Sequence, residues 1–260
     1  MANALRRAKF SGPDPTALAV CLCAGGSGLS GRGMACLLRL RRAQLRLMEQ
    51  SRGALVRIEA RKAAPLLDLA ACADSPLVGD FLSLLLLQLV SDYPERARTL
   101  RAMLHARRTT LDVPAAARDL WRPDGDTSLR AASRRARIDA RLLSLCLWAA
   151  LKPVCEAVAR AFLRHVNAPG GTADCPLCGG PAWAYCAGRA RCAVCETAWR
   201  APARRGWQDA PMERVRGARL RWNRASGARA FELDRALFET AFHAGPLIEL
   251  VRRLETPGAP

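Results

Sequence analysis

Four cysteines in two closely spaced pairs carry the clearest chemistry in this sequence. Cys175 and Cys178 form one Cys-x-x-Cys pair, and Cys192 and Cys195 form the other. Two residues between thiols let one tight turn direct both sulfurs at a single point, and two such turns complete a tetrahedral thiolate cage. Gly179 follows the first pair and permits the positive backbone φ that such a turn uses. The spacing therefore predicts one metal ion bound by all four cysteines.

The spacing predicts which residues bind the ion, but it does not determine which metal is bound. A tetrahedral four-sulfur cage suits zinc and also the single iron of a rubredoxin-like site, so the predicted cofactor is one Fe or Zn ion. Closed four-cysteine sites are ordinarily structural, which favours an ion that folds a ribbon too small to fold alone. Four thiolates around a divalent ion leave a charge of about −2. We expect Arg189, Arg191 and Arg200 to offset it from nearby positions in the sequence.

A fifth cysteine, Cys186, lies between the two pairs and breaks their symmetry. Its simplest interpretation is a buried, inert thiol, and two alternatives stay open: a replacement ligand, or a redox-active thiol activated by Arg189 or by the ion. Three further cysteines lie on apolar, helix-like segments and are predicted core residues: Cys72, Cys146 and Cys155.

The elements that must position these thiols follow from local pattern. Pro181–Tyr185 and Gly188–Arg191 are suited to a β-hairpin with Ala187-Gly188 at its tip, which would bring the two pairs together. Upstream, Ser75 and Pro76 are typical of a helix start, and the helix that follows to Ser91 is apolar on nearly every face, so it should be covered on all sides.

The whole chain divides into four parts. Residues 1–50 form a poorly defined Arg/Gly-rich leader, 51–168 a helical domain, 172–200 the metal ribbon, and 201–260 a loop and strand segment followed by C-terminal helices. Within these parts, Ser128–Asn167 is expected to be one long helix or a pair divided at Pro153, and Phe231–Leu254 is expected to be helical. The fold class is mainly α: a helical bundle, then a small rubredoxin-like or zinc-ribbon β module, then a C-terminal helical segment.

Composition limits the class of protein. Apolar residues at 50% and charged residues at 25% are near the averages for soluble globular proteins. Lys and Arg number 41 against 23 Asp and Glu, a net charge of +18 that suits nucleic acid, an anionic surface or an acidic protein, although a GC-rich genome would also enrich Arg. No uninterrupted apolar run reaches the roughly 18–20 residues of a membrane span, so no membrane partner is predicted. Clustered, paired cysteines indicate metal binding in a reducing compartment.

A catalytic constellation is not evident. His105, His165 and His243 lie in separate predicted helices, and paired acidic residues occupy helix ends, where capping explains them. No serine nucleophile elbow occurs in the sequence. We therefore predict that the protein is not an enzyme.

The ribbon resembles that of a known family. Cys175-Pro176-Leu177-Cys178-Gly179-Gly180, followed by Cys192-Ala193-Val194-Cys195-Glu196-Thr197-Ala198-Trp199, is similar to the CPxCG and C-x-x-C-E-T-x-W knuckles of the formate dehydrogenase accessory protein family, FdhE. Leu66–Gln88, which contains Ser75–Phe81, resembles the family's N-P-L-G-D-Y-type segment. Leu143–Ala159, which contains Leu147–Leu151, resembles its last apolar helix before the ribbon. The resemblance covers roughly residues 50–200. It departs at residues 201–260, which contain no cysteine, whereas family members usually carry a second pair of CxxC knuckles there.

The resemblance implies a divergent, one-ribbon FdhE relative. Such a protein would be a cytoplasmic, non-enzymatic maturation factor that binds the catalytic subunit of a respiratory formate dehydrogenase before export, with a redox role for the iron or the thiols. The basic surface would meet acidic patches on that client.

Two other classes of function stay open. The first is a zinc-ribbon nucleic-acid-binding protein, in which Arg side chains contact phosphates and Trp183, Tyr185 or Trp199 stack on bases. The net charge favours it, whereas scattered Arg residues and an aromatic content of 5% do not. The second is a scaffold for helix-mediated assembly, and a homodimer is compatible with either class.

Overall fold

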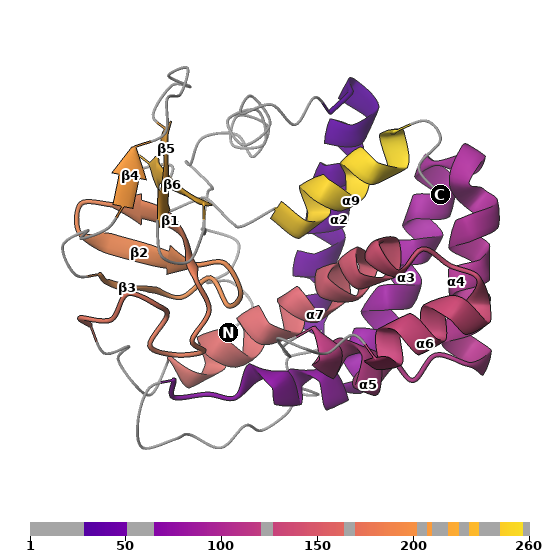
Figure 1. Ribbon diagram of the computed structural model, residues 1–260, viewed down its shortest axis with the longest axis horizontal. Helices are drawn as coiled ribbons and strands as arrows, with labels where there is room; N and C mark the ends of the chain where they lie inside the picture. Colours follow the sequence, from indigo (N-terminus) through magenta and orange to yellow (C-terminus); the bar gives the residue numbers. More distant parts are fainter. Residues whose placement is uncertain are drawn as a thin grey trace.

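Helices and a small sheet occupy separate sides of the molecule (Figure 1). The computed structural model describes residues 29–50, 65–120, 127–163, 170–201, 207–209, 218–223, 229–233 and 245–256. The helical elements are α2 (Gly31–Gln50), η2 (Leu69–Asp74), α3 (Pro76–Asp92), η3 (Pro94–Arg96), α4 (Ala97–Thr109), α5 (Val113–Asp119), α6 (Thr127–Ala136), α7 (Ala140–Phe162) and α9 (Gly245–Glu255). The predicted fold class, a helical bundle with a small β module and a C-terminal helix, is confirmed.

The core extends through both parts of the molecule. Cys72, Cys146 and Cys155 are buried, as predicted, among the apolar side chains of the helices. The same cluster of buried residues includes Leu177 and Trp199 of the ribbon. The ribbon is therefore packed on the helical part and does not stand apart from it.

Helix α3 begins as its sequence predicts, with Ser75 at the N-cap position and Pro76 in the first turn. The prediction that other elements cover this helix on all sides was wrong. Leu82 and Leu86 are buried, but Leu84 is 46% exposed and Leu87 is 54% exposed. An apolar sequence on every face shows that a helix lacks a polar face, but it does not show that every face is covered by another element.

The leader boundary at residue 50 does not mark the start of the folded helical part. Residues 31–50 form α2, and its Cys36, Leu37 and Leu40 are buried in the core. Helix α9 lies beside it and buries Leu250 and Val251. Residues 1–28 of the predicted leader and residues 51–64 lie outside the described residues.

The long helix predicted over Ser128–Asn167 is two helices, and the break is not at Pro153. It falls at Arg137, which adopts a φ of 52° between α6 and α7. The Ile138 N–H donates to the Ser133 carbonyl at 2.9 Å, which closes α6, and Asp139 caps α7 by accepting from Leu142 N–H at 2.6 Å. Glycine usually supplies this left-handed conformation, so a break at an arginine leaves little trace in the sequence.

Pro153 lies inside α7 because a neighbouring helix replaces the bond that proline removes. A proline has no N–H to donate to the carbonyl four residues earlier, here Ala149. The Gln44 side chain of α2 donates to that carbonyl at 2.6 Å. Helix α7 therefore continues through a proline because α2 is packed against it.

The β part is a six-stranded sheet in the order β3-β2-β1-β6-β5-β4. Its strands are β1 (Ala182–Cys186), β2 (Arg189–Cys192), β3 (Ala198–Arg200), β4 (Trp207–Asp209), β5 (Ala218–Asn223) and β6 (Arg229–Leu233). The predicted hairpin is confirmed: β1 and β2 are antiparallel, and Ala187 and Gly188 at its tip have φ of 46° and 76°.

The sheet continues past residue 200. Strand β6 pairs in parallel with β1, placing Ala184 opposite Phe231, and β5 and β4 follow by antiparallel pairing. The prediction of a helix over Phe231–Leu254 was therefore wrong at its start. Phe231–Leu233 belong to β6, the strand that pairs with β1. Pairing between strands so distant in sequence is not visible in local periodicity.

Helix α7 is long and apolar enough by hydropathy to cross a membrane, and 78% of its most apolar window is buried inside the protein. Central helices of compact proteins pass the same test. Its apolar sequence is interrupted by Lys152 and Glu156, whose side chains are buried.

A substitution in α7 tests its central place. Leu147 is fully buried, so Leu147→Ala should lower the free energy of unfolding by about 2–5 kcal/mol. The matched control Leu87→Ala removes the same atoms from an exposed site and should change it by no more than about 0.5 kcal/mol. Urea denaturation measures both. Equal losses in the two variants would contradict this packing.

Candidate metal centre

The four predicted ligand thiols converge. Their sulfur atoms all lie within 4.8 Å of one another. Cys178 Sγ lies 3.4 Å from Cys192 Sγ and 3.5 Å from Cys195 Sγ, and Cys175 Sγ lies 3.7 Å from Cys195 Sγ. A tetrahedron with metal–sulfur bonds of about 2.3 Å has sulfur–sulfur edges of about 3.8 Å. These separations are far longer than a disulfide bond and match a cage around one ion.

The first knuckle, Cys175–Gly180, is closed by its own backbone. Gly179 N–H donates to the Cys175 carbonyl at 2.7 Å, and Cys175 N–H donates to the Gly180 carbonyl at 2.9 Å. Gly179 has a φ of 73°, as the sequence predicts. A Cβ on Gly180 would lie 3.0 Å from Cys192 Sγ and 2.7 Å from a Val194 methyl, so a side chain there would push the two knuckles apart.

The second knuckle, Cys192–Thr197, directs backbone amides at sulfur. The N–H groups of Val194 and Cys195 donate to Cys192 Sγ at 3.3 and 3.5 Å. The Thr197 hydroxyl lies 3.1 Å from Cys195 Sγ. Such hydrogen bonds stabilise thiolate charge and fix the orientation of the ligands.

Both knuckles are anchored to the helical part. Leu66 N–H donates to the Pro176 carbonyl at 3.0 Å and Leu67 N–H to the Leu177 carbonyl at 2.7 Å, which ties the segment before η2 to the first knuckle. The second knuckle is held by Lys152 of α7, whose ammonium donates to the Ala193 carbonyl at 2.9 Å. The site is therefore built at the junction of ribbon and helices.

Crowding and burial shift the pKa values of three of the ligand thiols. Hydrogen bonds with the other three thiols raise the pKa of Cys178, and burial is the main cause that raises the pKa of Cys192. Burial also disfavours the Cys195 thiolate, but hydrogen bonds from the other thiols and Thr197 outweigh it and lower the pKa of Cys195.

Comparison with known proteins does not assign this site. No family model, curated protein or solved structure matches the chain. The resemblance to the FdhE family therefore depends on the quoted residues alone and stays a prediction.

The residues expected to surround the cage are placed unevenly. Arg191 Nη1 lies 3.9 Å from a Glu196 carboxylate oxygen, beside the second knuckle. Arg189 and Arg200 are exposed and lie opposite each other on β2 and β3. Cys186 is half-buried at the end of β1 and does not belong to the four-sulfur cluster.

The roles of several residues that support the centre were not predicted from the sequence. Glu196 adopts a φ of 60° immediately after Cys195, and its carboxylate accepts from Lys152 Nζ at 2.8 Å. The Trp199 indole N–H donates to the Thr172 carbonyl at 2.9 Å and closes the ribbon. A lysine inside an apolar helix was the available signal, because a buried ammonium requires partners.

The arrangement provides four sulfur ligands for one ion. It leaves no coordination position on that ion for a substrate. Cys175, Cys192 and Cys195 are buried, and Cys178 is half-buried. With all four positions of a tetrahedron filled by protein, a bound ion has no open position, which is the pattern of structural and electron-transfer sites.

Substitution of the ligands tests the cage. Cys192→Ser should abolish stoichiometric metal binding and unfold residues 172–200, because three thiolates and an alcohol bind far more weakly and the ribbon folds with its ion. Cys186→Ser is the matched control and should keep both the ion and the fold. Elemental analysis and hydrogen exchange measure the outcome. An ion retained by the Cys192→Ser protein would contradict the assigned ligands.

Proposed function

We propose that the protein is a non-enzymatic maturation factor that uses a tetrathiolate metal ribbon to hold its shape while it binds a partner protein. By resemblance to the FdhE family, the partner is the catalytic subunit of a respiratory formate dehydrogenase, met in the cytoplasm. The observation that carries the proposal is the closed four-sulfur cluster packed on a helical body.

The state of the aromatic side chains favours this function over nucleic-acid binding. The alternative requires the ribbon to present Trp183, Tyr185 or Trp199 to bases. In the structure these side chains are only 2%, 3% and 2% exposed. Buried rings cannot stack on unpaired bases, so this part of the alternative was wrong.

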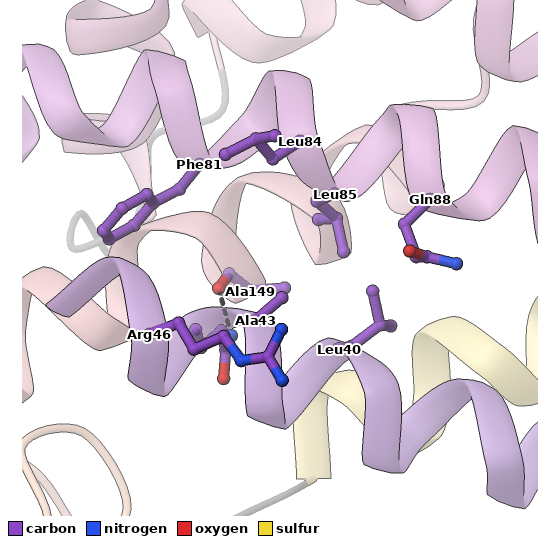
Figure 2. A pocket seen from close by; sticks show the side chains of 9 residues that line it. Leu40, Ala43, Arg46, Phe81, Leu84, Leu85, Gln88 and Ala149 are labelled. Carbon is purple, nitrogen blue, oxygen red and sulfur yellow. Dashed lines mark hydrogen bonds between the residues drawn. The ribbon is translucent and has the colours of Figure 1, made fainter. Parts of the chain in front are cut away.

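A groove on the helical part favours a protein partner. A cavity of about 250 Å³ lies between α2 and α3. Leu40 and Ala43 of α2 face Phe81, Leu84 and Leu85 of α3 across it, as Figure 2 shows. The two exposed large apolar side chains of the described part of the chain, Leu84 and Leu87, lie at this groove or one turn from it. Apolar surface of this kind is typical of a site for another polypeptide.

The charges beside the groove indicate the chemistry of that polypeptide. Arg46 lines the cavity, and Arg42 lies one helical turn before it on α2, both exposed. With a net charge of +18, the chain favours an acidic partner. The occupant we propose is an apolar client segment flanked by Asp or Glu.

Purification without added metal tests the centre itself. We expect one ion per chain in the wild-type protein. One zinc in a colourless protein assigns a structural role to the centre, whereas one ferric iron, seen as red thiolate-to-iron absorption, assigns it a redox role. Elemental analysis with visible absorption measures this, and a folded protein without stoichiometric metal would contradict the proposal.

Binding to the client tests the groove. The double variant Leu84→Asp with Leu87→Asp should weaken binding of the formate dehydrogenase catalytic subunit from the same organism at least tenfold, because carboxylates replace the apolar surface and repel acidic groups. Isothermal titration measures the affinity.

The matched control is Ala187→Asp at the tip of the β1–β2 hairpin. This exposed position has a φ of 46°, which aspartate tolerates, so the substitution adds negative charge away from the groove. It should leave client affinity unchanged. Equal weakening by both variants would count against the groove, and absence of wild-type binding would count against the client.

A further inference from the structure

A chain of buried charges joins α2, α7 and the second knuckle. The Lys152 side chain is 2% exposed, so its charged ammonium lies inside the protein. It donates to the carbonyls of Ala193 and Val194 at 2.9 and 3.4 Å and to the Glu196 carboxylate at 2.8 Å. All three donor contacts of the ammonium are therefore made with the segment that carries Cys192 and Cys195.

The two carbonyls belong to peptide groups whose opposite sides face a ligand sulfur. The Ala193 carbonyl shares its peptide with Val194 N–H, and the Val194 carbonyl shares its peptide with Cys195 N–H. Both N–H groups donate to Cys192 Sγ. Because the carbonyl and N–H of a trans peptide point in opposite directions, a cation on one side orients and polarises the donors on the other.

On its other side the ammonium faces Glu156, and Glu156 in turn connects it to α2. Glu156 lies one turn along α7, fully buried, with a carboxylate oxygen 3.6 Å from Lys152 Nζ. Arg41 of α2 binds this carboxylate through both terminal nitrogens, each at 2.9 Å. A bidentate pair between buried groups is specific in geometry, so α2 is fixed in position relative to Lys152.

The carboxylates around Lys152 favour its charged form. Burial disfavours the ammonium, but the charges of Glu196 and Glu156 outweigh it and raise the pKa of Lys152. Burial likewise disfavours the Glu156 carboxylate, and Arg41 and Lys152 outweigh it and lower the pKa of Glu156. Two further arginines approach these carboxylates: Arg160 lies 3.5 Å from Glu156 and Arg191 lies 3.9 Å from Glu196.

We propose that Lys152 is the positioning residue of the metal centre and that, through Glu156 and Arg41, it couples metal occupancy to the packing of α2 on α7. The inference rests on the four-thiolate site proposed above. Lys152 touches neither ion nor ligand sulfur, and acts by orienting the two peptide groups that hydrogen-bond to Cys192.

The test uses the full chain with Co²⁺ as the probe, since thiolate-to-cobalt absorption reports the four-sulfur site directly. Lys152→Met keeps the length of the apolar stem and removes the donor. Loss of a group that orients a metal ligand costs about 10–100-fold in metal affinity, and we expect a loss in this range. The matched control is Arg141→Met, also on α7, where the exposed guanidinium pairs with Glu249, and it should keep wild-type affinity.

Hydrogen exchange measures the coupling. Addition of Co²⁺ to the metal-free wild-type protein should slow exchange of the α2 amides as well as those of the knuckles. Arg41→Met removes the link to α2 while leaving Lys152 on the knuckle, so this variant should bind Co²⁺ with slower exchange in the knuckles but no slowing in α2. A purely local effect of the metal, with α2 unchanged in the wild type, would overturn the coupling.

The outcomes separate this inference from the proposed function. A folded Lys152→Met protein that binds Co²⁺ as tightly as the wild type overturns the positioning role alone. A wild-type protein that binds no Co²⁺ overturns the metal centre and the inference together. Should Lys152→Met fail to fold by circular dichroism, Glu196→Gln preserves the shape of the partner and should weaken Co²⁺ affinity about tenfold, and unchanged affinity in that variant overturns the role.

Discussion

The buried ammonium of Lys152 is the constraint on which the junction of this molecule depends. A charge inside a protein needs counter-charges and hydrogen-bond acceptors, and here they come from Glu156 on the same helix and from Glu196 and two carbonyls of the ribbon. Separating the ribbon from α7 would take Glu196 and both carbonyls away from the ammonium, and loss of one partner of a buried ion pair costs about 3–5 kcal/mol. The ribbon and the helices consequently form one structure, although the sequence predicts separate parts over residues 51–168 and 172–200.

The same interface resolves a second local conflict. Pro153 frees the Ala149 carbonyl in the middle of α7, and Gln44 of α2 donates to it, the hydrogen bond drawn as a dashed line in Figure 2. One turn before Gln44, Arg41 binds Glu156. Helix α2 therefore supplies α7 with a donor for the backbone carbonyl and a bidentate partner for the carboxylate. A helix with a proline and two buried charges is stable here only as part of this pair.

Local chemistry made the metal site and its hairpin predictable, whereas distant pairing did not. Cysteine spacing, Gly179 and the Ala187-Gly188 turn each act within a few residues, and all three were confirmed. The break at Arg137 was missed because a left-handed arginine carries no glycine signal. Strand β6 and the contact of Lys152 with Glu196 join segments more than forty residues apart, and periodicity contains no information about such partners.

Helix α2 lines the apolar groove and is connected to the second knuckle through Arg41, Glu156 and Lys152. One face of α2 presents Arg41 and Gln44 to α7, and another presents Leu40, Ala43 and Arg46 to the groove. In the function that we propose, a fully ligated ion has no position for a client, so it would contribute to binding only through the shape of the protein. The coupling that we propose gives this contribution a physical route. One ion-pair network holds both the second knuckle and a wall of the groove, so loss of the ion would loosen the wall and leave its surface chemistry unchanged.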